Sequence, residues 1–260
     1  MIESNEVMTF VHSLYPRELA ESWDSVGFIS GDWHSSVTKI LVTVDHSEDV
    51  LNEAIAINAD LIISHHPLFL PRHSIVTEPY KTRLALRAIA HGVSLANAHT
   101  NADHANPGVS DYLAQRLQLT ECQPIIPIEF ESSLGTGRIG NLQTPMKLGE
   151  FAQLISSHVS GSYPRFSGDS DQLVSRVAVC GGAGDSLLAA VRNTNADVYV
   201  TSDLRHHPVA EHKDAGGCAL IDIDHRAAEA TWLEPFAQIL TKGLGIDVHV
   251  STTNTSAWNS

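Results

Sequence analysis

An internal repeat constrains this chain more than any other feature of its sequence. Residues 39–44 form an apolar, β-branched run, residues 48–58 show the pattern of a helix, and residues 61–64 form a second apolar run. The same succession recurs in the second half, where Asn58-Ala59-Asp60 and Asn195-Ala196-Asp197 stand at one constant offset. Two copies of a strand–helix–strand unit predict two α/β lobes related by pseudo-symmetry.

Histidines and carboxylates follow the repeated strands at corresponding places. His65-His66-Pro67 follows the first copy, and His206-His207-Pro208 follows the second slightly further downstream. A later apolar run in each half ends in a histidine followed, after three residues, by a carboxylate. These pairs are His99 with Asp103 and His225 with Glu229. Open α/β sheets carry their ligand sites at the carboxyl ends of the strands, so we expect these side chains at such an edge.

The predicted fold class is therefore α/β, with two pseudo-symmetric lobes of mixed sheets flanked by helices. We assign residues 1–125 together with 241–260 to the first lobe, which carries the His65-His66 half-site. Residues 126–240 form the second lobe, with the His225 and Glu229 half-site. Helices are also expected over residues 109–117, 148–158, 186–194 and 227–240, a short strand over 138–142, and a loose polar tail over 251–260.

Charge and composition exclude several classes of partner. The formal net charge of -14 opposes generic binding to nucleic acid or to an anionic membrane, and no run of Lys or Arg offsets it. No stretch is apolar over the roughly 18 residues of a membrane span, and the N-terminus lacks the pattern of a signal peptide. Three widely spaced cysteines without a CxxC argue against a disulfide framework. We expect a reduced, cytoplasmic protein.

The histidines and carboxylates that follow the strands predict a metal site. Neighbouring side chains at a strand end diverge, so His65 and His66 fit two neighbouring ions about 3.5–4 Å apart better than one ion. His225 and Glu229 stand at i and i+4 of a helix start and project from one face, and Glu229 is long enough to bridge two ions. Asp103 adds another oxygen ligand. Three imidazoles and two carboxylates suit Zn, Fe, Mn, Ni or Co without choosing among them.

Each of these residues also has a plainer interpretation. His65 and His66 fit strand-end histidines with structural partners, Asp103 fits a turn cap, and Glu229 fits a helix surface. Two groups further along remain open as well. His99 fits a position beside the site or a structural one, and the His206-His207 pair fits either a site wall or a solvent-facing helix start. Asp45 and His46 end the strand that begins at Ile40 and point to the same edge, although Asp45 also fits a helix cap.

Several motifs together resemble the GTP cyclohydrolase 1 type 2 / NIF-three-like family. The resemblance covers nearly the whole chain in order. It rests on Glu21-Ser22-Trp23-Asp24-Ser25-Val26-Gly27, Ser64-His65-His66-Pro67, His99-Thr100-Asn101-Ala102-Asp103, Gly137-Arg138-Ile139-Gly140, Cys180-Gly181-Gly182-Ala183-Gly184 and His225-x3-Glu229. The chain departs from the family at Thr201-Ser202-Asp203 and lacks the usual C-terminal proline, which leaves substrate contacts open.

The resemblance implies a centre of two divalent metal ions in the cleft between the lobes and assembly into a toroidal homohexamer. His65 and Asp103 would hold one ion, His66 and His225 the other, and Glu229 would bridge both. The length is that of the family's short form, without the domain that longer members insert. Candidate substrate contacts are Asp45, His46 and Asp203.

The function implied is hydrolytic. A metal-activated water would attack a purine nucleotide, for GTP at C8 of guanine with release of formate, and His99 or His207 would serve as general acid or base. One alternative is a nucleotide phosphoester hydrolase that uses the same ions to polarise phosphate oxygens. The other is a non-catalytic metal-binding or regulatory hexameric scaffold.

Overall fold

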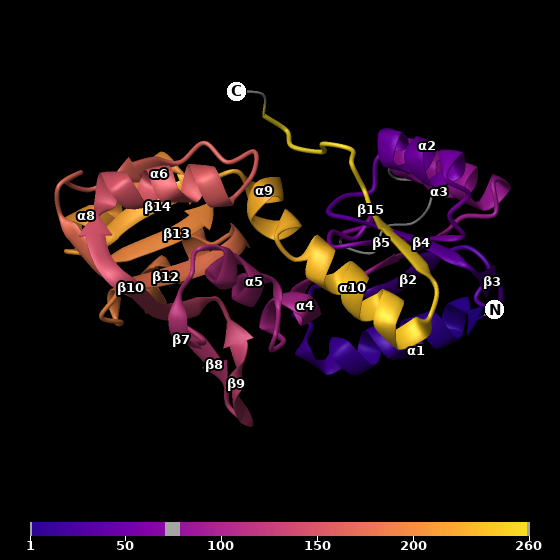
Figure 1. The fold of residues 1–260 in the computed structure, drawn as a ribbon, viewed down its shortest axis with the longest axis horizontal. Coiled ribbons are helices and arrows are strands. Elements are labelled where there is room, and N and C mark those ends of the chain that lie inside the picture. Colours follow the sequence, from indigo (N-terminus) through magenta and orange to yellow (C-terminus); the bar gives the residue numbers. More distant parts are fainter. Residues whose placement is uncertain (1, 71–78, 259–260) are drawn as a thin grey trace. The chain divides into compact units, whose positions relative to one another are not determined.

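The computed structural model describes residues 2–70 and 79–258 and separates into two compact units (Figure 1). The first unit contains residues 1–105 and 233–255, and the second contains residues 106–232 and 256–260. The predicted boundaries, after residues 125 and 240, differ from these. The reason is packing: the segment after residue 105 joins the sheet of the second unit, and the helix from residue 233 packs on a strand of the first. Residues 1, 71–78 and 259–260 of the predicted first lobe lie outside the described residues.

The first unit is built on a five-stranded mixed sheet. Its strands, in spatial order, are β15 (Asp247–Val250), β4 (Lys39–Thr43), β5 (Leu61–Ser64), β6 (Ser94–Asn97) and β2 (Gly27–Ser30). The first four are parallel, and β2 runs antiparallel to β6. Every residue of β5 and β6 is buried, as expected for strands covered on both faces. A short pair, β1 (Ile2–Glu3) and β3 (Ser36–Val37), lies apart from this sheet.

Helices cover both faces of this sheet (Figure 1). On one face lie α2 (Glu48–Ala56) and α3 (Pro79–Ala90), whose apolar residues share a core with Leu41, Ile62 and Leu95. On the other lie α1 (Ser4–Leu14) and α10 (Leu233–Leu244), which pack together. The short η1 (Arg17–Leu19) and α4 (Thr100–His104) contact each other. Ser47 caps α2 by accepting from the amide of Val50, as the sequence predicts.

The second unit is built on a six-stranded mixed sheet. Its strands, in spatial order, are β11 (Arg165–Ser167), β14 (Ala219–Ile223), β13 (Val198–Ser202), β12 (Leu173–Ala183), β10 (Arg138–Lys147) and β7 (Thr120–Gln123). The central strands β14, β13 and β12 are parallel, and the outer ones are antiparallel to their neighbours. A hairpin of β8 (Ile126–Ile128) and β9 (Glu131–Thr136) precedes β10.

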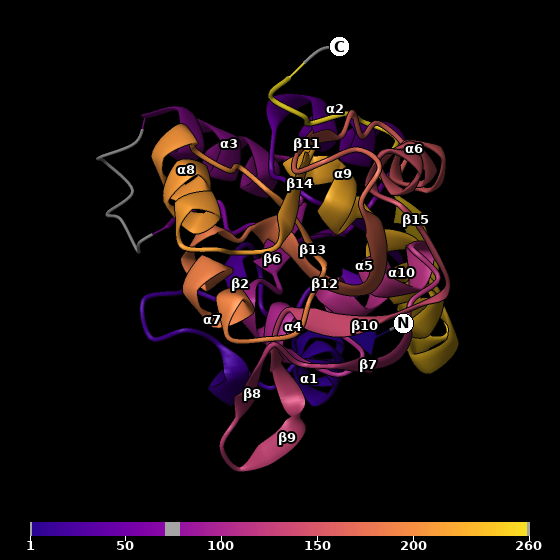
Figure 2. The same ribbon diagram turned by 90° about the vertical axis from the view of Figure 1, so that its left-hand side faces the viewer.

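Two groups of helices pack on this sheet, as Figure 2 shows. One face carries α5 (Val109–Arg116), α6 (Leu148–His158) and α9 (His225–Ala230), whose apolar side chains meet Val177, Val200 and Ile221. The other carries η2 (Asp185–Leu187), α7 (Leu188–Arg192) and α8 (His206–Asp214), which pack on Ala178, Tyr199 and Leu220.

The internal repeat is visible in the strand register and in one hydrogen-bonding pattern. Ile40 pairs with Leu61 in the first unit, and Val177 pairs with Val198 in the second, at the same offset in sequence. The Asp60 carboxylate accepts from the amides of Thr38 and Lys39. The Asp197 carboxylate accepts from the amides of Ser175 and Arg176 in the same way. The two halves therefore share a strand–helix–strand unit down to its side-chain contacts.

Three sequence expectations require correction. The helix predicted over residues 227–240 is two helices, α9 and α10, separated after residue 230. The helix predicted over residues 186–194 is shorter, because α7 covers only Leu188–Arg192 and follows η2. The start of the predicted loose tail is held in place, because Ser251, Thr252 and Thr253 all hydrogen-bond to the Glu53 carboxylate.

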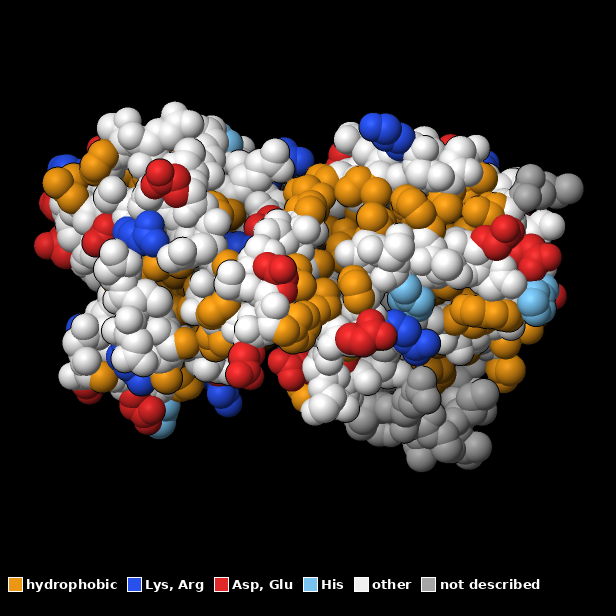
Figure 3. All heavy atoms as spheres, turned by 90° about the horizontal axis from the view of Figure 1, so that it is seen from below, with side chains coloured by type: hydrophobic (Ala, Val, Ile, Leu, Met, Phe, Trp, Pro, Cys, Tyr) orange, Lys and Arg blue, Asp and Glu red, His pale blue; other side chains and the backbone are white. Residues whose placement is uncertain are grey.

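On the face shown in Figure 3, lysine and arginine side chains are scattered among acidic and apolar ones. No cationic patch stands out there, which agrees with the charge of the chain. Within the described residues, no helix is both long and apolar enough to cross a membrane.

Candidate metal centre

Three histidines of the first unit form a cluster at the carboxyl ends of two neighbouring strands. His65 and His66 follow β5, and His99 follows β6. The ring centroid of His65 lies 5.0 Å from that of His66 and 5.2 Å from that of His99. The ring centroids of His66 and His99 are 5.6 Å apart. One nitrogen from each ring lies within 4.8 Å of the others. We call these three residues the imidazole cluster.

Each ring of the imidazole cluster is oriented through its Nδ1 atom. His65 Nδ1 lies 3.0 Å from the carbonyl oxygen of Ala98, and His66 Nδ1 lies 2.7 Å from Asp45 Oδ1. His99 Nδ1 lies 3.0 Å from Asp24 Oδ1. Since these partners are acceptors, each Nδ1 donates a proton, and the neutral ring then carries its lone pair on Nε2. An oxygen acceptor behind the imidazole is the usual arrangement of histidine metal ligands.

Two carboxylates complete this part of the first unit. Asp103, in the first turn of α4, places Oδ1 3.8 Å from Nε2 of His65. The side chain of Asp24 is fully buried and accepts from His99, from the amide of Ser25 and from both the amide and hydroxyl of Thr100. Burial alone would raise the pKa of Asp24, but these hydrogen bonds outweigh it and hold the pKa well below its usual range. Asp24 is therefore an anion fixed behind His99.

In the second unit, His225 and Glu229 are joined directly. Asp224 caps α9 by accepting from the amide of Ala227 at 2.7 Å, so the helix begins at His225. Nε2 of His225 lies 2.8 Å from Oε1 of the buried Glu229, which confirms that both project from one helix face. Nδ1 of His225 donates to Asp203 at 2.6 Å. An acidic residue thus stands behind this histidine too, as Asp45 does behind His66.

Gly182 makes room for this pair. The residue has a φ of +75°, which side-chain-bearing residues rarely adopt. A Cβ added there would collide with Oε1 of Glu229 and would lie 3.3 Å from Nε2 of His225. Glycine at position 182 therefore leaves space for the Glu229 carboxylate and also permits the positive φ of the backbone.

The candidate substrate contacts Asp45 and Asp203 have orienting roles in the structure, because each accepts from a histidine Nδ1. His46 lies in the loop between β4 and α2, with both ring nitrogens shielded from solvent. Burial lowers the pKa of His46 to about 4, so its ring is neutral near pH 7.

The second His-His pair stands on a different helix from His225, which begins α9. His206 and His207 begin α8, and their ring centroids are 5.3 Å apart. Both are exposed. His206 lines a pocket on the α8 side of the sheet, whereas His207 does not line the pocket that contains His225.

Sequence reasoning missed the residues that orient the histidines. Asp24 was part of a motif but had no assigned role, and the partners of His225 and His66 were expected to contact substrate. The available signal was chemical: a metal-binding histidine needs an acceptor for its second ring nitrogen. Three acidic residues near strand ends could have been assigned to that task.

Comparison with known proteins agrees with this architecture. A model of the Duf34/NIF3 (NGG1p interacting factor 3) family matches residues 2–257. The chain belongs to the Duf34/NIF3 family. A relative from Streptomyces coelicolor, named GTP cyclohydrolase 1 type 2 homolog, is 38% identical over 98% of this chain and 93% of that protein. A Mycobacterium leprae relative of the same name is 30% identical over 98% of this chain and 94% of that protein. That alignment spans 367 positions, more than this chain's 260 residues, so this Duf34/NIF3 chain lacks segments that the longer relative contains.

Solved structures of other Duf34/NIF3 proteins share the fold. A Staphylococcus aureus hypothetical protein has a TM-score of 0.90 at 30% identity and covers 99% of both chains. The Bacillus cereus protein related to NIF3 has a TM-score of 0.93 at 22% identity, covering 100% of this chain and 99% of the other. The α/β fold of two lobes predicted from the internal repeat is confirmed.

Proposed function

We propose that this protein is a dinuclear-metal-dependent hydrolase that acts on a purine nucleotide. The observation that carries the proposal is the orientation of the imidazole cluster. The two proposed ligands of this cluster, His65 and His66, each have an acceptor fixed behind Nδ1, which is what a metal ligand requires and what a surface histidine does not need. The donor set of imidazoles and carboxylates also fits Zn, Fe, Mn, Ni or Co.

In this proposal the half-sites of the two units act together. His65 and Asp103 would hold one divalent ion, His66 and His225 would hold the second, and Glu229 would serve both. Bound ions of this kind supply an acidified water at neutral pH. The buried position of Glu229, 4% exposed at its side chain, supports a ligand role, because a lone carboxylate is rarely buried without a cation.

The remaining polar residues orient ligands and move protons. Asp45 and Asp203 fix the rings of His66 and His225. His99 is the candidate general acid or base, because Asp24 donates no proton and stabilises the imidazolium that forms when Nε2 takes one up. His99 adjoins both neighbouring histidines, which supports this role over one for His207.

The substrate proposed is GTP, following the name of the curated relatives. One water adds at C8 of guanine and opens the imidazole ring to a formamide, and a second water hydrolyses the remaining C–N bond, which releases formate and leaves a diaminopyrimidine. The test is formate release by protein reconstituted with each candidate metal. We expect His65→Ala and Glu229→Ala each to abolish it, whereas His91→Ala, an exposed histidine of the first unit, leaves it unchanged.

The products also decide between this proposal and its alternatives. Phosphate release without formate would identify a nucleotide phosphoester hydrolase. Tight metal binding without turnover of any nucleotide in a broad panel would identify a non-catalytic scaffold.

A further inference from the structure

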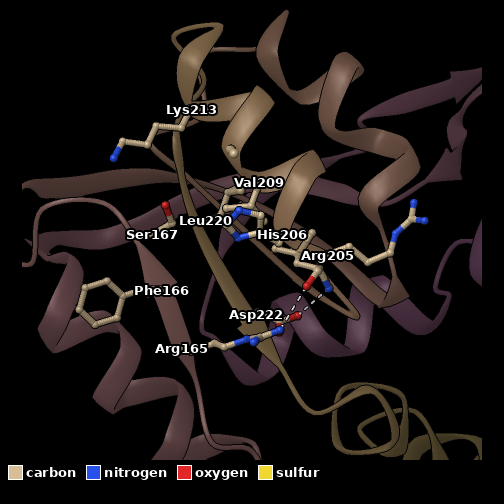
Figure 4. A pocket seen from close by; sticks show the side chains of 11 residues that line it. Arg165, Phe166, Ser167, Arg205, His206, Val209, Lys213, Leu220 and Asp222 are labelled. Atoms are coloured by element: carbon tan, nitrogen blue, oxygen red, sulfur yellow. Dashed lines mark hydrogen bonds and ion pairs between the residues drawn. The ribbon is translucent and has the colours of Figure 1, made fainter.

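Two neighbouring pockets of the second unit lie along one face of the strand pair β11 and β14. The first, of about 310 Å³, lies between these strands and α8 (Figure 4). The second, of about 540 Å³, includes His225 in its wall. Arg165, Leu204 and Asp222 line both pockets, so the pockets adjoin each other.

The strand register places the two pockets in a row. Ser167 pairs with Leu220 and Arg165 pairs with Asp222, and directly opposed residues share a face of the sheet. Leu220, Asp222 and Asp224 alternate along β14 and beyond its end, so the row continues to the residue that precedes His225. Four residues of extended chain span about 13 Å. A nucleobase alone is too short to occupy both pockets, whereas a nucleoside with a phosphate chain is long enough.

The pocket beside His225 has exposed aromatic walls. Tyr163 is 66% exposed and Trp258 is 77% exposed, although the same unit buries Trp232 completely. Trp258 follows a fixed point of the chain, because the hydroxyl of Ser256 donates to Asp224 at 2.6 Å. Exposed aromatic rings at a concave site are suited to stacking with a planar heterocycle, and every nucleobase offers such a face.

The pocket near α8 also has an exposed aromatic ring, Phe166, and differs mainly in its charge. Its floor is formed by the buried Leu204 and Leu220. Lys213 lies at the end opposite the Arg165–Asp222 ion pair (Figure 4), and among the described residues no carboxylate lies within ion-pair distance of its ammonium group. His206 and Ser167 add donors at the same cavity. This pocket therefore offers an uncompensated cation in a chain whose net charge is -14.

The charge of the lining side chains becomes more negative from the pocket near α8 to the pocket beside His225. In the pocket near α8, Arg165 pairs with Asp222 and Arg205 pairs with Asp185, so Lys213 is the lining cation without an ion-pair partner among the described residues. In the other pocket Arg165 is outnumbered by Asp203, Asp222 and Asp224. An elongated ligand with one anionic end would bind with that end at Lys213 and its uncharged ring at His225.

We propose that this row binds a nucleotide with its base on Tyr163 and Trp258 beside His225 and its phosphates at Lys213 and His206. The orientation rests on the proposed function and deepens it. It presents a ring, and not a phosphate ester, to the metal ligands, and so favours ring hydrolysis over phosphoester hydrolysis.

Calorimetric titration of the full chain, both metal-free and zinc-loaded, tests the proposal with GTP, guanosine and inorganic triphosphate as probes. Tyr163→Ala should weaken GTP and guanosine binding about tenfold and leave triphosphate unaffected. Lys213→Ala should weaken GTP and triphosphate binding about tenfold and leave guanosine unaffected. The matched controls, Tyr80→Ala and Lys81→Ala in α3 of the first unit, should change neither.

Intrinsic fluorescence supplies a second measurement. Guanine stacking should quench the emission of Trp258, and the quench should be lost in Trp258→Phe. The proposal is overturned if GTP binds to neither form of the protein, or if Tyr163→Ala and Lys213→Ala bind all three probes like the parent. Binding with the expected pattern but without formate release would sink the proposed hydrolysis alone. Formate release that is indifferent to both substitutions would sink the orientation alone.

Discussion

At the scale of single residues, histidines and the acids behind them are arranged alike in both units. His66 donates to Asp45, His99 to Asp24 and His225 to Asp203, in each case through Nδ1. An anionic acceptor fixes the tautomer and makes Nε2 a stronger base. The acids therefore determine how well the histidines can bind metal, although none of them is a predicted ligand.

Replacing Asp45 by asparagine should lower metal affinity about 10- to 100-fold, because the ring of His66 loses its anionic partner. Competition with a chromophoric chelator measures this directly. Asp32→Asn, at an exposed position of the same unit, is the matched control and should bind metal like the parent. Equal affinity of the Asp45 variant and the control would contradict the orienting role.

The ligand residues could be predicted from sequence because residue type and spacing are local properties. Two adjacent histidines at a strand end and a histidine four residues before a glutamate are visible without a structure. The aromatic pair Tyr163 and Trp258 was not predictable. These residues stand far apart in the sequence, and they come to one pocket only because β11 returns antiparallel to β14 and the terminal segment joins the second unit.

At the scale of elements, the strongly apolar central strands and the periodic helices were predictable, and edge strands were not. β15 carries only Val248 and Val250 as apolar residues. Its partner β4 lies far earlier in the sequence, since Asp247 pairs with Lys39. The division between α9 and α10 had a readable signal. Pro235 lies in the first turn of α10, where proline is tolerated, whereas the interior of the predicted single helix would exclude it.

The segment after β15 makes the first unit sensitive to acid. Burial alone would raise the pKa of Glu53, but hydrogen bonds from Ser251, Thr252 and Thr253 lower it from 4.5 to about 2. A carboxylate with a depressed pKa contributes stability above its unfolded pKa and loses it as pH falls through the folded value. Glu53 should therefore stabilise the fold at pH 5 and above, and progressively less between pH 4.5 and about 2.

Urea unfolding as a function of pH measures this contribution. Glu53→Gln should be less stable than the parent at pH 7, and the difference should shrink as pH falls toward 3. Asp49→Asn, an exposed position on the same helix for which the described residues supply no ion pair, should show no comparable loss of stability at pH 7. A Glu53→Gln difference that does not depend on pH would contradict the assignment.

At the scale of the whole molecule, the resemblance leads us to propose a homohexamer. Light scattering coupled to size-exclusion chromatography should give a mass six times the 28.1 kDa of one chain. A monomer or dimer at micromolar concentration would contradict it. The measurement is best made with and without added zinc, because metal that stabilises each chain also shifts assembly by mass action.

The order in which the chain passes through its two units has a consequence for synthesis. Residues 106–232 are inserted within the first unit, whose α10 and β15 come from residues 233–250. On the ribosome, β4 therefore emerges long before the strand that covers its open edge. The β4 edge of the first unit therefore stays unpaired while the inserted unit is synthesised and can fold. A chain interrupted after residue 232 would leave the half with the imidazole cluster unfinished, so the two half-sites are completed in the reverse of their order in the sequence.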